Sequence, residues 1–275
     1  MSEIVILGGG ESGTGAALLA QAKGMQVFVS DLGKIKDDYK KVLSNAKIPF
    51  EENGHTKDRV LAAKEVIKSP GIPDTVPLIK QLDNQGTPVI DEIEFAARYT
   101  SGKLIGITGS NGKTTTTLLT YETLKKAKLK VGLAGNIGQS MAAQLVDTDY
   151  DYWVLELSSF QLDRMYNTVI HIATIINITP DHLDRYDNEF SNYVNSKFRI
   201  IRNQTAKNHL VFFADDEVIL QQLEKNDIQS QVHGFSLKDP QVSGGWLENE
   251  SITINIKGSL KMSIQKLAID RKTHV

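Results

Sequence analysis

Cysteine, long apolar runs and an excess of either charge are all missing from this sequence of 275 residues. The lack of cysteine excludes disulfides, thiolate metal sites and cysteine nucleophiles. No apolar run approaches the roughly 20 residues that cross a bilayer, and a net charge of −2 gives no reason to expect a nucleic-acid or membrane partner. The amino terminus, MSEIVILGGG, has no basic segment or cleavage site of a secretory signal. We therefore expect a cytoplasmic protein.

What is present is an alternation of short β-branched runs with longer helical stretches, which indicates right-handed βαβ units and parallel sheets. Helical stretches at 12–23 and 75–84 belong to the first of two series. We expect two α/β domains that divide near 95–103: a Rossmann-like domain at 1–95 and a P-loop-type domain at 96–275. The expected strands are 4–7, 27–30, 65–68 and 88–90, then 104–108, 130–133, 152–157, 173–178 and 210–213.

The last part of the chain changes character, because its apolar runs become short and turns separate them closely. Runs at 246–248, 251–256 and 261–265 are divided by turns at 248–250 and 257–259. This spacing predicts a small antiparallel β portion at the C-terminal end of the second domain.

The first glycine loop, Gly8-x-Gly10-x-x-Gly13, lies between an expected strand and a helix, and Asp31 ends the next apolar run. These residues match the fingerprint of a dinucleotide site, in which glycines and a helix N-terminus hold a diphosphate. Taken alone, the motif predicts a nicotinamide- or flavin-dependent oxidoreductase.

A second glycine loop occurs in residues 104–117, LIGITGSNGKTTTT. Glycines let backbone N–H groups approach a phosphate, Lys113 supplies a cation for the β- and γ-phosphates, and the Thr114 hydroxyl is a Mg²⁺ ligand. Strict P-loop spacing requires glycine where Ile107 stands. We interpret the segment as a variant phosphate loop; the alternative is an ordinary glycine-rich turn capped by threonines.

Candidate metal ligands follow two later strands. Glu156 lies in an apolar strand, where a lone carboxylate is costly unless it binds a cation. Asp181 and His182 follow the next strand, and the carboxyl ends of parallel strands carry the sites of such sheets. We expect these residues to meet at the second loop and bind a metal, although Asp181 as an N-cap and His182 as a capping residue is the alternative. Lys197, in an expected helix over 190–202, has only the spacing of a surface lysine.

Five stretches together resemble one known family, the Mur ligases of peptidoglycan synthesis. They are 69–72 (SPGI), 107–114 (ITGSNGKT), 135–138 (GNIG), 156–162 (ELSSFQL) and 177–185 (NITPDHLDR). The similarity runs from the first strand to about residue 267. Within the family, ELSSFQL resembles the branch that adds D-glutamate to UDP-N-acetylmuramoyl-L-alanine rather than the folylpolyglutamate synthetases.

The resemblance implies an ATP-dependent amide ligase. In such an enzyme ATP phosphorylates the acceptor carboxylate, and the amine of D-glutamate attacks the acyl phosphate to give the amide, ADP and phosphate. We expect a monomer that acts on these small-molecule substrates, with ATP and two Mg²⁺ ions as cofactors.

The resemblance also assigns roles to single residues. The triphosphate is held by Thr108, Gly109, Ser110, Asn111, Gly112, Lys113 and Thr114. One Mg²⁺ is bound by Thr114 and Glu156, and a second by His182 and Lys197, the lysine that the family carries as a carbamate. The UDP-sugar is bound by Ser12, Gly13, Asp31, Leu32, Ser69, Pro70, Gly71, Asn136, Ser159 and Gln161. The catalytic group is Lys113, Asn136, Glu156, His182 and Lys197.

Complete members of the family have a third, amino-acid-binding domain, which we expect this chain to lack. Here 266–269 (KLAI) is followed by DRKTHV, where the family has Gly-x-His-Asn. Two further interpretations stay open: a nucleotide- or UDP-sugar-binding fragment without turnover, and a related ATP-dependent ligase, either another Mur ligase or one like the folylpolyglutamate synthetases.

Overall fold

The first of two sheets is fully parallel. A computed structural model describes residues 3–266; the predicted departure from the family pattern at 267–275 lies outside the described residues. The sheet has the order β3-β2-β1-β4-β5, and β1 and β2 are buried along their whole length, as their unbroken apolar sequences predict. Its strands are β1 (Ile4–Leu7), β2 (Val27–Ser30), β3 (Phe50–Glu51), β4 (Glu65–Lys68) and β5 (Val89–Ile90), with helices α1 (Glu11–Ala22), α2 (Asp37–Asn45), α3 (Lys57–Leu61) and α4 (Pro77–Asn84).

The second sheet has the order β14-β13-β12-β11-β10-β9-β6-β8-β7, and only its β12–β13 and β13–β14 pairs are antiparallel. Its strands are β6 (Lys103–Thr108), β7 (Val131–Gly135), β8 (Tyr152–Glu156), β9 (Ile172–Ile175), β10 (His209–Phe213), β11 (Gln231–Ser236), β12 (Gly244–Glu248), β13 (Ser251–Asn255) and β14 (Ser259–Ser263). Its helices are α6 (Lys113–Lys126), α7 (Met141–Gln144), α8 (Ser159–Asp163), α9 (Phe190–Phe198) and α10 (Glu217–Lys225), with 3-10 turns η2 (Leu183–Arg185), η3 (Arg199–Ile201) and η4 (Ile264–Lys266).

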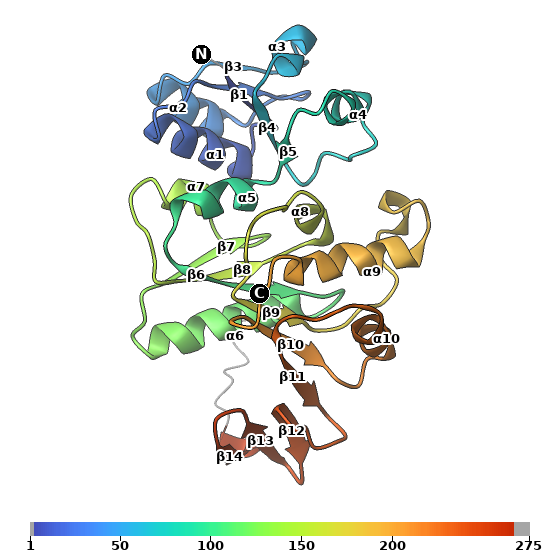
Figure 1. The fold of residues 1–275 in the computed structure, drawn as a ribbon. Coiled ribbons are helices and arrows are strands. Elements are labelled where there is room, and N and C mark those ends of the chain that lie inside the picture. The colour runs from blue at the N-terminus through green and yellow to red at the C-terminus, as the bar shows by residue number, and fades with distance from the viewer. Residues whose placement is uncertain (1–2, 267–275) are drawn as a thin grey trace.

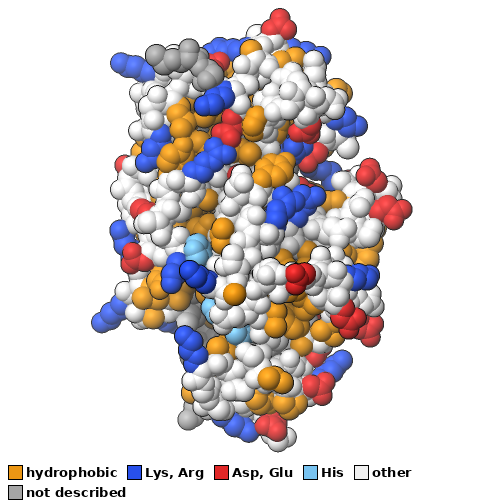
Figure 2. All heavy atoms as spheres, viewed as in Figure 1, with side chains coloured by type: hydrophobic (Ala, Val, Ile, Leu, Met, Phe, Trp, Pro, Cys, Tyr) orange, Lys and Arg blue, Asp and Glu red, His pale blue; other side chains and the backbone are white. Residues whose placement is uncertain are grey.

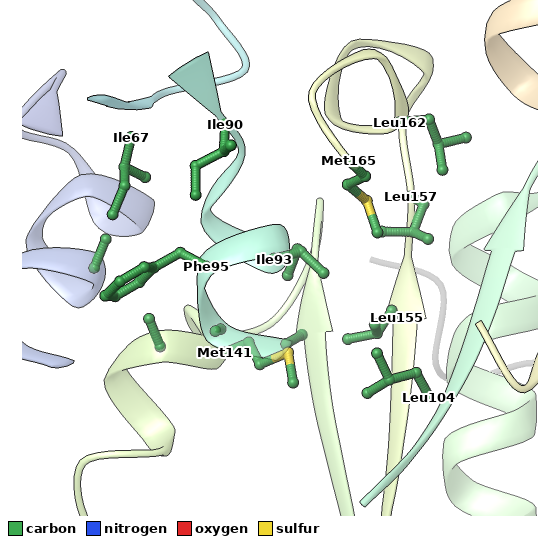
Figure 3. Packing of buried hydrophobic residues seen from close by; sticks show 14 of the residues in the cluster. Ile67, Ile90, Ile93, Phe95, Leu104, Met141, Leu155, Leu157, Leu162 and Met165 are labelled. Atoms are coloured by element: carbon green, nitrogen blue, oxygen red, sulfur yellow. The ribbon is translucent and has the colours of Figure 1, made fainter. Parts of the chain in front are cut away.

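The two sheets share one hydrophobic cluster, which forms where α5 (Glu92–Ala96) and η1 (Ala97–Tyr99) connect them. Figure 3 shows Ile93 and Phe95 of α5 between Ile67 on the first sheet's side and Leu155 on the second's. Helix α1 also packs on α7, where a Cβ at Gly15 would lie 2.0 Å from the Ser140 hydroxyl. The predicted domain boundary at 95–103 therefore begins inside helix α5, which is packed in this shared core.

Most predicted elements are found, and the differences are local. The sequence does not predict β3, which has two residues, or β11, whose sequence QVHGFS is too polar to read as a strand. The predicted helix over 190–202 is α9 followed by η3. The predicted antiparallel strands are β12, β13 and β14, but Ser259 begins β14 and does not belong to the turn predicted at 257–259.

The surface has no single dominant charge on the face seen in Figure 2, where Lys and Arg alternate with Asp and Glu. This mixture agrees with the net charge of −2. Across residues 3–266, no helix combines the length and the apolar character that a membrane crossing requires.

Candidate active site

The second glycine loop joins β6 to α6, and an asparagine from the neighbouring strand shapes it. The Asn177 carboxamide oxygen accepts hydrogen bonds from Ser110 N (3.1 Å) and Asn111 N (2.8 Å), and its amide donates to Asn111 O (3.0 Å). The Ser110 hydroxyl donates to Thr179 O at 2.9 Å, and that of Thr108 donates to Leu157 O at 2.8 Å. Gly112 has φ +80°, a conformation that favours glycine, and precedes the helix.

Two lysine ammonium groups converge on this loop from different helices. Lys113 Nζ donates to Gly109 O (2.9 Å) and Ser110 O (3.0 Å), and Lys197 Nζ donates to the same Gly109 O at 2.8 Å. Neither has a carboxylate within ion-pair distance among residues 3–266. Two lysine amines that donate to one carbonyl and have no counter-ion among the described residues make the loop a favourable place for an anion.

Glu156 ends β8 and lies beside the loop. The parallel registers pair Glu156 with Ile107 of β6 and with Gly135 of β7, so the ends of three strands meet here. Its carboxylate is 1% exposed and accepts from the Thr114 hydroxyl (2.8 Å) and the Asn136 amide (2.8 Å). A Cβ at Gly135 would lie 2.1 Å from Glu156 O, so only glycine allows this approach. Three of the predicted site residues are thus in direct contact.

A cavity of about 370 Å³ opens over these groups. It is lined by Ser110, Asn111, Gly112, Lys113, Thr114, Thr115, Asn136 and Glu156. Backbone N–H groups at the start of α6, the Lys113 ammonium and a carboxylate–hydroxyl pair therefore border one space, which suits a phosphate with a divalent cation.

Lys197 is 1% exposed, although its spacing alone predicts a surface position. Its ammonium lies 4.5 Å from the centre of the Tyr193 ring. Burial and, to a smaller extent, the charge of Lys113 lower the pKa of Lys197 to about 7, and the charge of Asp181 partly opposes them. A substantial fraction of this amine is therefore neutral at neutral pH.

His182 is held apart from the buried carboxylate. It has φ +50°, its side chain is 53% exposed, and its Nε2 lies 3.5 Å from Asp181 Oδ2. It precedes η2 but makes no capping hydrogen bond through its side chain, and Asp181 accepts from His182 N at 2.9 Å. In the part of the chain that the structure describes, no three Asp, Glu or His side chains gather as metal ligands. The expected convergence of Glu156, Asp181 and His182 is therefore not seen.

The first glycine loop is built around Asp31. Its carboxylate accepts from Gly9 N (2.7 Å) and Gly33 N (2.8 Å), while the adjacent Leu32 is 71% exposed. A Cβ at Gly13 would lie 1.8 Å from Gly8 O, so the first turn of α1, which contains Ser12, packs directly on the loop. Asp31 thus holds the loop's own backbone, a use that its place in the motif does not predict.

The other predicted substrate residues lie in two places. Ser69, Pro70 and Gly71 follow β4, and Ser69 lies against Gly8, where an added Cβ would be 2.8 Å from the serine Cβ. Ser159 and Gln161 lie in α8 and are 3% and 2% exposed. Gln161 completes a capping box by accepting from Ser158 N at 3.0 Å.

Two residues that hold segments of the site in place are absent from the list of site residues predicted from the sequence. Asn177 shapes the second glycine loop, and its position after an apolar strand is the same signal that identified Asp181 and His182. The Ser140 hydroxyl donates to Glu92 at 2.8 Å and Ser140 N to Glu11 at 3.2 Å, which ties the segment after Asn136 to α5 and α1. No pattern in the sequence predicts the contacts of Ser140 with Glu92 and Glu11.

The chain matches two known domain families and several curated proteins. Residues 107–270 match the Mur ligase middle domain, and residues 3–76 match the MurD N-terminal domain. The chain is 52% identical over 269 residues to a UDP-N-acetylmuramoylalanine–D-glutamate ligase of Bacteroides fragilis, and the match covers 98% of this chain and 61% of the relative. The enzyme of the same name from Christiangramia forsetii is 48% identical over 271 residues, with the same two coverages of 98% and 61%.

Solved structures share the fold at lower identity. The UDP-N-acetylmuramate:L-alanyl-gamma-D-glutamyl-meso-diaminopimelate ligase from Neisseria meningitides has a TM-score of 0.62 at 18% identity, covering 93% of this chain and 84% of that one. The UDP-N-acetylmuramate-alanine ligase of Thermotoga maritima has a TM-score of 0.54 at 21% identity, covering 95% and 60%. The chain spans about 61% of the length of the curated relatives that it matches.

Proposed function

The chain belongs to the Mur ligase family, and on that premise we propose that it forms the UDP-sugar- and ATP-binding parts of an enzyme that adds D-glutamate to UDP-N-acetylmuramoyl-L-alanine. In this proposal residues 1–95 are the UDP-sugar-binding domain and residues 96–275 the ATP-binding domain. The protein acts as a cytoplasmic monomer on small molecules. The observation that carries the proposal is the contact of Thr114 and Asn136 with buried Glu156 beside two lysines that lack a counter-ion.

The residues at the loop suit Mg²⁺·ATP. Among residues 3–266, the only hydrogen bonds to the Glu156 side chain come from the neutral Thr114 and Asn136, so this buried carboxylate has no cation to balance it. Magnesium in nucleotide sites takes one or two protein oxygens and completes its shell with phosphates and water. Thr114 and Glu156 would hold the ion, which would neutralise charge on the triphosphate.

The chemistry requires that two anions, the acceptor carboxylate and the γ-phosphate, come together. Lys113, together with the backbone N–H groups at the start of α6, would offset their repulsion and orient the triphosphate. Asn136 N donates to Glu156 O at 2.8 Å, so the residue proposed to contact the acceptor is fixed to the strand that carries the metal ligand. Catalysis in such a site is mainly positioning and charge neutralisation.

The first loop would hold the diphosphate of the UDP-sugar. Gly8 to Gly13 and the start of α1 present backbone N–H groups, and Ser69 to Gly71 border the same loop. Asp31 and exposed Leu32 lie at its edge, where the uracil would bind. Leu32 is exposed enough to pack on a planar base.

Lys197 would act as a carbamate in the second metal site with His182. The neutral amine forms an N–C bond to CO₂, one C=O bond pair moves to oxygen, and the nitrogen loses a proton to water. The product is an anion, which the neighbouring Lys113 would stabilise for the same reason that it disfavours the ammonium form.

Labelled CO₂ tests the carbamate directly. In ¹³C-bicarbonate the wild-type chain should show a carbamate resonance that Lys197→Met abolishes. Lys68→Met is the matched control, because Lys68 is also buried but forms an ion pair with Asp74 at 3.2 Å. A resonance that persists in Lys197→Met, or none in the wild type, would remove the carbamate from the mechanism.

Calorimetric titration together with a phosphate-release assay tests the function. We expect the chain to bind Mg²⁺·ATP and UDP-N-acetylmuramoyl-L-alanine separately, and to release phosphate only when D-glutamate is also present. Binding of both without release would assign ligand binding alone to this chain. Binding of neither, or binding of a nicotinamide dinucleotide at the first loop, would contradict the assignment.

A further inference from the structure

Arg164 joins the two halves of the molecule through its side chain. It directly follows α8, and its side chain is 8% exposed. Its two terminal nitrogens donate to the two carboxylate oxygens of Asp83, at 2.8 and 2.9 Å, and its Nε donates to Asp74 at 3.1 Å. Asp83 lies in α4 and Asp74 in the loop after β4, so one guanidinium holds two segments of the first sheet's unit (Figure 1).

Lys68 extends the network of ion pairs around Arg164 into the loop after β4. It is the last residue of β4, with a side chain that is 2% exposed. Its ammonium lies 3.2 Å from the Asp74 oxygen that also accepts from Arg164, and it donates to Ile72 O at 2.6 Å. The network therefore reaches the turn formed by Ser69–Ile72, in which Ile72 N donates to Ser69 O at 3.0 Å.

The backbone of Arg164 is held as firmly as its side chain. Its N–H donates to Gln161 O at 3.0 Å, and its carbonyl accepts from Asp91 N, which precedes α5, at 3.0 Å. The residue is thus attached to α8, to α5, to α4 and to the loop after β4. Two of these elements carry proposed UDP-sugar residues: Ser159 and Gln161 in α8, and Ser69, Pro70 and Gly71 in the loop.

We propose that Arg164 is a positioning residue for the UDP-sugar, acting through Asp74 and Lys68 to hold the Ser69–Gly71 turn at a fixed distance from α8. The inference rests on the proposed function and adds to it a residue that touches neither substrate. Its role depends on geometry as well as charge, because a planar guanidinium reaches Asp83 through two nitrogens and Asp74 through a third. A lysine at this position would offer a single charged point.

The charge of Arg164 persists across the neutral range. Burial opposes the charge of Arg164, but the hydrogen bonds to Asp83 and the charge of Asp74 outweigh it and hold the pKa of the guanidinium above its ordinary value. Burial lowers the pKa of Lys68, and Asp74 counteracts this through both its charge and its hydrogen bond.

The test compares Arg164→Met, Arg164→Lys and Asp83→Asn with Arg98→Met. Arg98 is the matched control, because it also makes a two-point contact, to Glu65 at 2.8 and 2.8 Å, but at the opposite end of β4. Calorimetry measures the dissociation constants for UDP-N-acetylmuramoyl-L-alanine and, separately, for Mg²⁺·ADP. Hydrogen exchange measures the backbone amides of 69–76.

We expect Arg164→Met to weaken UDP-sugar binding by about tenfold, a typical coupling between linked sites, with Mg²⁺·ADP binding unchanged and faster exchange at 69–76. Arg164→Lys and Asp83→Asn should show the same selectivity with smaller losses, and Arg98→Met should show none. UDP-sugar binding that stays at the wild-type value in Arg164→Met, or equal losses for both ligands, would overturn the positioning role. Failure of the wild type to bind the UDP-sugar would instead reject the proposed function, while the exchange data would still show whether Arg164 holds the turn.

Discussion

The two glycine loops have the same local plan and different chemical surroundings. Each joins a buried strand to a helix, and in each a side chain from another strand end holds the loop's backbone. In the first loop that side chain is the Asp31 carboxylate, whereas in the second it is the neutral Asn177 carboxamide. Two lysine amines, from Lys113 and Lys197, and the buried Glu156 carboxylate surround the second loop. Among residues 3–266, no Lys or Arg makes a hydrogen bond or ion pair to residues 8–13.

This difference would allow one glycine motif to serve the two ligands that we propose. A loop with backbone donors alone suits a diphosphate that is bound and kept intact. A loop with cations, a hydroxyl and a carboxylate suits a triphosphate whose charge must be neutralised during transfer. The glycine pattern specifies the close approach of backbone to phosphate, and the residues around it specify the chemistry.

Removing the Lys113 ammonium group should weaken ligand binding at the second glycine loop and not at the first. Lys113→Met is expected to weaken Mg²⁺·ATP binding by about 100-fold, the effect of deleting one partner of a hydrogen-bonded charge pair, and to leave UDP-sugar binding unchanged. Calorimetry with each ligand measures both. Lys125→Met, at the exposed far end of the same helix, is the control. An equal loss for both ligands would show that the loops are not independent sites.

The contact between the two units should make stability depend on pH. Burial, reinforced by the charge of Asp91, raises the pKa of Glu92 to about 8, while the unfolded chain has the ordinary value of 4.5. The folded state therefore binds more protons between these values, so the free energy of unfolding should fall as pH rises, by about 3.5 kcal/mol from pH 5 to pH 8.

Thermal or urea unfolding across this pH range measures the effect. Glu92→Gln should flatten the profile, since a neutral amide resembles the protonated acid. Glu122→Gln, on the exposed face of α6, should not. A wild-type stability that rises over the same range would show that Glu92 is ionised in the folded state.

Neutralising the buried carboxylate should separate metal binding from phosphate binding. Glu156→Gln is expected to weaken Mg²⁺·ATP binding by about tenfold, in the range seen when metal sites are disturbed, while ATP binding in EDTA stays the same. Titrations with and without Mg²⁺ measure this difference. A loss of similar size in EDTA would mean that Glu156 shapes the loop instead of holding a metal.

The smallest effect is expected at the first loop. Asp31→Asn removes one charged acceptor from two backbone N–H groups and should lower stability by about 1 kcal/mol. It should weaken UDP-sugar binding slightly and leave ATP binding unchanged. Urea unfolding and calorimetry measure these changes, with Asp38→Asn, which is 95% exposed, as the control. An effect on ATP binding would contradict the separation of the two loops.

Predictions from the sequence succeed where local signals are strong. The bounds of β1, β2 and β4 agree with their apolar runs, because buried parallel strands need continuous apolar sequence. Strand β11 does not follow this rule, since its Gln, His and Gly residues form a strand through pairing with β10 and β12. The glycine loops and Glu156 are predicted for the same local reason, as each follows or ends an apolar strand.

The surroundings of the site could not be predicted in this way. Lys197 has the spacing of a surface residue, yet the packing of α9 carries its ammonium to Gly109, 88 positions away in sequence. His182 belongs to the same motif as Asp181, but its left-handed backbone conformation leaves it exposed. Arg164 belongs to no motif, and it gains two carboxylate partners only because α8 approaches both α4 and the loop after β4.

By itself, therefore, the sequence determined two strand–glycine loop–helix units and the family, because backbone conformation and strand burial depend on neighbouring residues. The tertiary structure decided the burial of Lys197, the exposure of His182 and the ion pairs of Arg164 with Asp74 and Asp83. Burial and charge pairing depend on segments that meet only after folding, and desolvation then sets the energy of each charged group.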